Sequence, residues 1–162
     1  MRAVLAIIGC GNANRSDDGV GPFVAQALLR RLHARPRDDV RVFDAGTGGM
    51  EVMFQARGAS RLIVIDASRS GSPAGAIFEV PGAELQRDHA PSFNLHEFRW
   101  DHALAAGRRI FREQFPSEVS VFLIEAQSLE LGLELSAPVR AAAEQVVAKL
   151  WRVIDEYVAD EA

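Results

Sequence analysis

The sequence has a single cysteine, a small deficit of basic residues and no long apolar run. One cysteine excludes a disulfide within the chain and is typical of proteins from reducing compartments. With 18 Lys and Arg against 22 Asp and Glu, the net charge is -4, which excludes an extended basic surface for nucleic acid or an anionic membrane. The apolar run near Met1 is too short for a signal peptide or a transmembrane helix. We therefore expect a cytoplasmic protein that binds neither nucleic acid nor membranes.

What the sequence does contain is an alternation of short apolar runs with longer amphipathic segments. The runs predict strands at 3–8, 39–44, 61–66 and 118–126, and an edge strand at 76–80. Helical spacing of apolar residues predicts helices at 20–34, 48–58, 94–115 and about 138–158, the last with Ser136 as its N-cap. This order predicts one α/β domain over residues 1–162, with a largely parallel sheet and helices on both faces.

Acidic residues follow most of the predicted strands. Asp17 and Asp18 lie beyond the first strand, Asp44 ends the second, Asp66 ends the third, and Glu125 lies at the end of a later one. Right-handed crossovers place the carboxyl ends of parallel strands along one edge of the sheet, where open α/β sheets bind their ligands. Because neighbouring carboxylates repel one another unless a cation joins them, these acids predict a cation-binding cleft.

The loop GCGNANRSDDGVG, residues 9–21, carries the first two of these acids. It resembles the dinucleotide-binding pattern G-x-G-x-x-G only superficially, because Asn14 stands in place of the third glycine. Two acids in the loop would also repel a pyrophosphate, so nucleotide binding is the weaker alternative. Helix capping needs one acceptor, and Ser16 or Asp17 supplies it. We therefore expect Ser16 or Asp17 to cap the following helix and Asp18 to point into the cleft.

Two further strand ends carry candidate residues. Asp66 follows four apolar residues in LIVID, and a lone aspartate there is ordinarily a helix cap or turn former. Its position beside the other acidic strand ends favours a functional role. The turn DAGTGG, residues 44–49, has small residues that allow a backbone such as a docked peptide strand to lie close to it, with Thr47 as an ordinary N-cap in the alternative interpretation.

Of the four histidines, His96 is the candidate metal ligand. In HEFRWDH, residues 96–102, the two histidines are six apart rather than four, so they point roughly 120° away from each other around a helix. His96 lies near the predicted helix start, whereas His102 is expected to pack or to face solvent. A partly buried histidine without a metal is an equally good interpretation of His96. Cys10 is expected to be a packing residue, because no sequence feature activates its thiol.

The ordered motifs are similar to those of a known family. GCGNANRSDDGVG, DAGTGG, LIVIDAS with PAG, a mid-chain histidine in a helix and SLELGLELSAPV follow one another as in the nickel–iron hydrogenase maturation endopeptidases. The resemblance runs from Met1 to about Val147. It implies a five-stranded, mostly parallel twisted sheet between helices, and removal of a C-terminal extension from the hydrogenase large-subunit precursor after nickel insertion. It also implies a metal-binding and catalytic trio at Asp18, Asp66 and His96.

The chemistry of this trio suits a borderline divalent metal. Two carboxylates and one imidazole provide O, O and N donors, which bind nickel or zinc. We expect nickel supplied by the substrate, with zinc or cadmium able to replace it. Asp44 and the turn formed by Gly46, Thr47, Gly48 and Gly49 are expected to position the scissile segment. A non-proteolytic nickel-sensing or chaperone module is the main alternative function.

Overall fold

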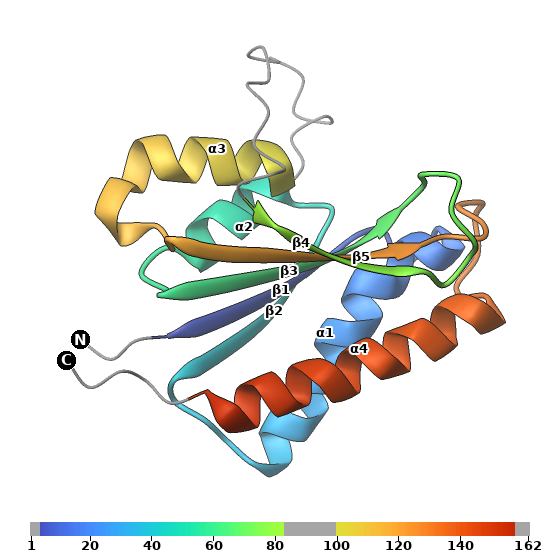
Figure 1. Ribbon diagram of the computed structural model, residues 1–162, viewed down its shortest axis with the longest axis horizontal. Helices are drawn as coiled ribbons and strands as arrows, with labels where there is room; N and C mark the ends of the chain where they lie inside the picture. The colour runs from blue at the N-terminus through green and yellow to red at the C-terminus, as the bar shows by residue number, and fades with distance from the viewer. Residues whose placement is uncertain (1–3, 83–99, 158–162) are drawn as a thin grey trace.

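The computed structural model describes residues 4–82 and 100–157 of the chain. In this part the strands form one sheet in the order β2-β1-β3-β5-β4, and β4 alone runs antiparallel to its neighbour. The strands are β1 Leu5–Cys10, β2 Val40–Gly46, β3 Arg61–Ser68, β4 Ile77–Pro81 and β5 Glu118–Glu125. The helices are α1 Val20–Ala34, α2 Gly49–Ala56, α3 Trp100–Phe111 and α4 Ala137–Glu156, with 3-10 turns η1 Ser16–Gly19 and η4 Arg112–Gln114. Figure 1 shows α1 and α4 on one face of the sheet and α2 and α3 on the other.

The predicted fold class is confirmed, and most element boundaries agree within two residues. The predicted helix at 94–115 is described only from Trp100, and residues 94–99 lie outside the described part of the chain. This helix ends at Phe111, earlier than predicted, because Arg112 has a φ of 48°, which an α-helix does not accommodate. Among the described residues, every helix is too short or too polar to cross a membrane.

Each face of the sheet has its own apolar core. On β1, Leu5 and Ile7 pack against α1 and α4, while Ala6 and Ile8 pack against α2 and α3. Successive side chains of a strand point to opposite faces, so a central strand covered on both sides is apolar at every position. This explains why β1 and β3 appear in the sequence as continuous rather than alternating apolar runs.

Helix α1 begins in direct contact with the backbone of the sheet. A Cβ atom at Gly21 would lie 2.2 Å from the carbonyl oxygen of Cys10 and 2.6 Å from that of Ile65. A Cβ atom at Gly9 would lie 2.2 Å from the carbonyl oxygen of Gly21. Only glycines fit at such distances, and they place the first turn of α1 on the carboxyl ends of β1 and β3, next to Asp66.

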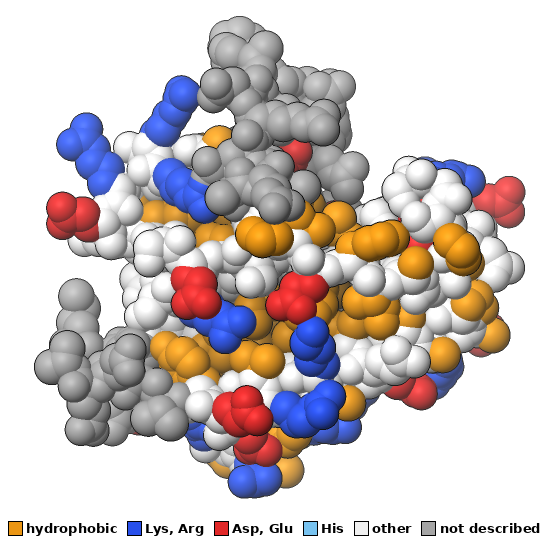
Figure 2. Space-filling view, viewed as in Figure 1, with side chains coloured by type: hydrophobic (Ala, Val, Ile, Leu, Met, Phe, Trp, Pro, Cys, Tyr) orange, Lys and Arg blue, Asp and Glu red, His pale blue; other side chains and the backbone are white. Residues whose placement is uncertain are grey.

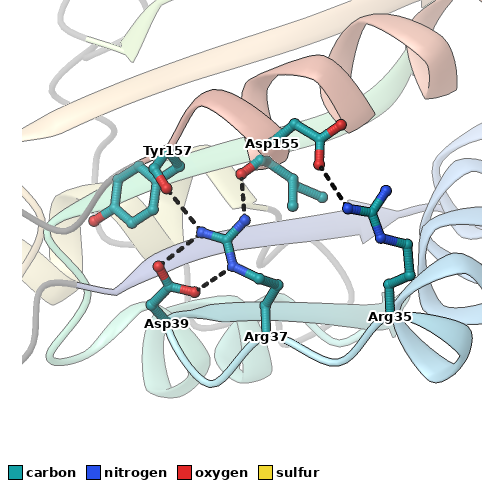
Figure 3. A network of polar contacts seen from close by, with 6 residues as sticks. Arg35, Arg37, Asp39, Asp155 and Tyr157 are labelled. Atoms are coloured by element: carbon teal, nitrogen blue, oxygen red, sulfur yellow. Dashed lines mark hydrogen bonds and ion pairs between the residues drawn. The ribbon is translucent and has the colours of Figure 1, made fainter.

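At the opposite edge of the sheet, Arg37 holds the end of α4 (Figure 3). Its guanidinium donates to both carboxylate oxygens of Asp39, at 2.9 and 2.8 Å, and to the carbonyl oxygens of Ile154 and Tyr157, each at 2.8 Å. The hydrogen bond to Asp39 raises the pKa of Arg37 above its ordinary value. Carbonyls at a helix C-terminus lack hydrogen-bond donors within the helix. Arg37 supplies these donors and so joins the end of α4 to the start of β2.

The contact between α1 and the sheet can be tested by replacing Gly21 with alanine. We expect Gly21→Ala to lower the free energy of unfolding by about 3 kcal/mol, because the added methyl group forces α1 away from β1 and β3. Urea denaturation followed by circular dichroism measures the change. In the control Gly48→Ala, the nearest atom would be the Ala45 oxygen at 3.3 Å, and a loss of about 1 kcal/mol or less is expected. Equal losses in the two variants would contradict the close approach.

Candidate functional site

The strands β1, β2 and β3, which carry or precede the candidate acids, end at the same edge of the sheet, the carboxyl edge, at the right of Figure 1. The N–H of Gly11 donates to the carbonyl oxygen of Gly46 at 2.8 Å, which joins the loops after β1 and β2. The turn η1, which contains Asp18, lies against β3, which contains Asp66. Asp18 and Asp66 are therefore carried by adjoining elements, as the positions of the acids in the sequence predict.

Asp66 is a buried carboxylate with fixed orientation. It is 3% exposed, and its Oδ2 accepts a hydrogen bond from Nε1 of Trp100 at 2.7 Å. Its Oδ1 accepts one from the N–H of Ala67 at 2.8 Å. Trp100 is the first residue of α3 that the structure describes and is itself buried, so this helix holds the Asp66 side chain on the α2–α3 face. The sequence gives no direct sign of this contact, because the donor lies 34 residues further along the chain.

Asp18 is half-buried and more open to a ligand than Asp66. Its Oδ2 accepts a hydrogen bond from the N–H of Asn12 at 2.9 Å, and the Asn12 side chain accepts one from the N–H of Asn14 at 2.9 Å. These contacts fix the turn that leads into η1. Within residues 4–82 and 100–157, Oδ1 of Asp18 accepts no hydrogen bond. As far as the described part of the chain is concerned, this oxygen is left for a ligand.

The prediction that Ser16 or Asp17 caps α1 is wrong. The N-cap of α1 is Gly19, without a side-chain hydrogen bond, and the Asp17 carboxylate turns instead to the loop after β5. It accepts hydrogen bonds from the N–H groups of Gln127, Ser128 and Ser136, at 2.8, 3.0 and 2.7 Å, and from the Ser136 hydroxyl at 2.8 Å. Ser136 is the N-cap of α4 by position, as predicted, yet its hydroxyl serves Asp17 rather than its own helix.

The electrostatics of Asp17 follow from these contacts. The side chain is fully buried, and burial alone would raise its pKa. The hydrogen bonds from Ser136, Ser128 and Gln127 outweigh that effect together and lower the pKa below its ordinary value. Asp17 is therefore an ionised structural residue that joins the β1–α1 and β5–α4 loops.

The buried charge of Glu125 is also stabilised by hydrogen bonds from the protein. It is 1% exposed, and its carboxylate accepts hydrogen bonds from the N–H and the hydroxyl of Ser70. The Ser70 N–H lowers the pKa of Glu125 most, against the opposing effect of burial. The premise that the gathered acids require a cation therefore fails for Asp17 and Glu125, because N–H and O–H groups of the protein stabilise both charges. No group of three His, Cys, Asp or Glu side chains suited to a metal ion occurs among the described residues.

Asp44 and the turn that follows it lie beside the first loop, on the α1 side of the sheet. The Asp44 carboxylate accepts hydrogen bonds from Nε2 of Gln26 on α1, at 3.1 Å, and from the N–H of Gly46 at 3.0 Å. Gly46 has a φ of 53°, a conformation that favours glycine. Asp44 and Asp66 therefore face opposite sides of the sheet. The alternative that Thr47 caps α2 is wrong, since the N-cap is Gly48.

The remaining candidates have simple outcomes. His96, the third member of the predicted trio, lies outside the described residues. His102 is partly exposed, and its backbone N–H donates to the neighbouring carboxylate of Asp101 at 3.0 Å. Cys10 is 7% exposed and packs in the α2–α3 core, as predicted.

The sequence and the fold are both similar to those of known proteins. The sequence profile of the family described as hydrogenase maturation protease matches residues 22–153. The chain is similar to the hydrogenase expression/formation protein HoxM of Azotobacter vinelandii, with 31% identity over 96% of this chain and 72% of that protein. It is also similar to the hydrogenase 2 maturation protease of Escherichia coli K12, with 29% identity over 90% of each chain.

Solved structures share the fold. The hydrogenase maturating endopeptidase HybD of Escherichia coli superposes with a TM-score of 0.75 at 23% identity, covering 94% of this chain and 93% of that one. The maturation protease HycI of Thermococcus kodakarensis gives a TM-score of 0.74 at 19% identity, covering 96% and 94%. At these identities the likeness concerns the arrangement of strands and helices alone.

The structural role of Asp17 can be measured directly. We expect Asp17→Asn to lower the free energy of unfolding by about 3 kcal/mol at pH 7, because buried N–H groups lose a charged acceptor. The lowered pKa of Asp17 means that its stabilisation is complete above the ordinary value of 3.8 and is lost as the pH falls below it. Urea denaturation from pH 7 to pH 3 should therefore show the difference between wild type and variant shrinking only at the acidic end.

A matched control is Asp155→Asn on α4. Asp155 is 48% exposed and lies 4.0 Å from Arg35, so its loss is expected to change the unfolding free energy by less than about 0.5 kcal/mol. A difference for Asp17→Asn as small as this, or one that grows as the pH falls, would contradict the assigned role of Asp17.

Proposed function

The chain belongs to the hydrogenase maturation protease family, and we propose that it removes a C-terminal extension from the large-subunit precursor of a nickel–iron hydrogenase after nickel insertion. The observation that supports the site is that η1, which carries Asp18, lies against β3, which carries Asp66, at the carboxyl edge of the sheet. We assign Asp18, Asp66 and His96 as the residues that bind the metal.

The chemistry of the donors supports this assignment. Asp18 has one carboxylate oxygen to which the described residues donate no hydrogen bond, and Asp66 is held rigidly by Trp100. With an imidazole they form an O, O, N set that suits nickel or zinc, and cadmium as a substitute. Three protein donors leave positions open for groups of the substrate or for water. A bound divalent metal supplies Lewis acidity that activates water for attack on a peptide bond.

In this proposal the nickel is part of the substrate. It is already bound in the precursor, and the trio recognises it there, so that a precursor without nickel presents nothing for the trio to hold. Cleavage then follows cofactor insertion and does not precede it. The reaction belongs in the cytoplasm, where a chain with one buried cysteine is stable in reduced form.

The turn after β2 is assigned to positioning the scissile segment. Gly46, Thr47 and Gly48 offer a backbone with little side-chain bulk beside the β1–α1 loop, and the buried Gly49 begins α2 directly after them. Asp44 acts indirectly, because its carboxylate holds the N–H of Gly46 and thereby fixes the shape of the turn. The exposed Met50 in the first turn of α2 adds an apolar side chain next to this turn.

The proposal predicts the effect of removing each member of the trio. Asp18→Asn, Asp66→Asn and His96→Ala are each expected to slow processing of a nickel-loaded precursor by about 1,000-fold. Asp18→Asn preserves the shape and an acceptor for the Asn12 N–H, so its loss of activity isolates the charge. Intact mass spectrometry of the precursor, which loses the mass of its C-terminal extension, measures the reaction.

Asp155→Asn, at the opposite edge of the sheet, is the control and should process the precursor at the wild-type rate. If Asp18 and Asp66 had only a structural role, their variants would unfold at lower temperatures, but the folded fraction of each variant would process the precursor at the wild-type rate. Wild-type protein that binds a nickel-loaded precursor without changing its mass would instead favour the sensing or chaperone alternative. Equal processing of nickel-loaded and nickel-free precursor would contradict recognition of the metal.

A further inference from the structure

Two leucines of the β5–α4 loop are almost fully exposed. Leu131 and Leu133 retain 77% and 81% of their surface, more than the other large apolar side chains exposed among the described residues. Single exposed leucines are common on protein surfaces. Two leucines flanking one glycine, Gly132, on a loop beside the candidate site form a localised apolar surface, which we name the leucine loop, residues 129–135.

The leucine loop is held firmly to the loop that carries Asp18. The N–H of Ser16 donates to the carbonyl oxygen of Gly132 at 2.8 Å, and the N–H of Gly132 donates to that of Asn14 at 2.9 Å. The Ser16 hydroxyl donates to the carbonyl oxygen of Glu130 at 2.8 Å. Asp17 fixes both ends of the loop through its hydrogen bonds to Ser128 and Ser136. The two leucines are therefore displayed from an anchored backbone.

The backbone of Ser16 supports the same conclusion. Its φ of 49° is uncommon for a residue other than glycine and carries a conformational cost. The hydrogen bonds to Gly132 and Glu130 hold it there. A surface whose backbone is fixed before binding loses less entropy on association than a flexible one, which favours tight contact per unit of buried area.

We infer that the leucine loop is a docking surface for the folded body of the precursor, outside the segment that is cleaved. This inference rests on the proposed function. An endopeptidase brings its protein substrate to the edge that carries Asp18, and the leucine loop is continuous with that edge through the contacts to Ser16 and Asp17. Figure 2 shows further hydrophobic side chains over β4 and at the end of the molecule where the β5–α4 loop lies.

Charge indicates what the partner surface is like. Glu130 and Glu134 are exposed on either side of the leucines. The complementary surface is an apolar depression that accepts two leucines and has lysine or arginine at its rim. A second copy of this chain is a poorer match, because its net charge is -4 and its own leucine loop is flanked by the same acids.

The test is the kinetics of precursor processing by the double variant Leu131→Ser/Leu133→Ser. We expect KM to rise by about tenfold or more with kcat unchanged, because the lost contacts are equal in the ground and transition states. Thermal unfolding should be unchanged, since both side chains are exposed. Glu134→Lys should raise KM at low ionic strength and lose its effect as salt is added.

Ile110→Ser is the matched control. Ile110 is 62% exposed but lies at the end of α3 remote from Trp100, and it should leave KM unaltered. An unchanged KM for the double leucine variant, or an equal rise for Ile110→Ser, would overturn the docking surface. So would a shift from dimer to monomer in sedimentation with KM unchanged, which would assign the leucines to a second copy.

The design separates the two proposals. If wild type processes the precursor and the leucine variant does so with the same KM, the docking surface is wrong and the proposed function stands. If wild type neither binds nor processes a nickel-loaded precursor, the proposed function is wrong and the docking surface, which depends on it, is wrong as well.

Discussion

The buried carboxylate of Asp17 is the interaction on which the carboxyl edge depends. It lies in the loop after β1 and binds three N–H groups and one hydroxyl from the loop after β5. These loops are more than a hundred residues apart in sequence and follow strands separated by β3 in the sheet. Without this ionised side chain, buried N–H groups would lack an acceptor. The two loops beside the candidate site would then no longer be held in a fixed position relative to each other.

The acids at this edge have different roles, and the hydrogen-bond donors around each one determine which role it has. Asp17 and Glu125 are fully engaged by groups of the protein and contribute to its architecture. Asp44 shapes its own turn on the other face of the sheet. Asp18 and Asp66 differ from these. Oδ1 of Asp18 accepts no hydrogen bond from the described residues, and Trp100 of α3 holds Asp66 toward the α2–α3 face. Neighbouring acids in a sequence, Asp17 and Asp18, thus have different roles.

The fold was largely predictable from the sequence because its signals are local. Continuous apolar runs on β1 and β3 reflect burial on both faces, and the spacing of apolar residues on α1 gave its bounds correctly. The contact between η1 and β3, which carry Asp18 and Asp66, was predictable as well, because topology alone brings parallel strand ends to one edge.

The polar partners were not predictable. Asp17 has every local feature of a helix cap and bonds to Ser136 instead, while Asp66 meets Trp100 from a distant helix. Such contacts depend on tertiary packing, which short-range patterns do not encode. The same is true of the end of α3, where the backbone at Arg112 adopts a positive φ that its residue type does not suggest.

The proposed metal site and the proposed docking surface recognise different features of the precursor. Contacts made by Leu131 and Leu133 are the same for a precursor with nickel and for one without it, so they raise affinity equally for both and cannot discriminate. Discrimination must come from groups that touch the metal itself, which in the proposal are Asp18, Asp66 and His96. The anchored loop can therefore be strongly apolar without relaxing the requirement for nickel. The Asp17 carboxylate matters to both surfaces, because it fixes the leucine loop relative to the turn that carries Asp18.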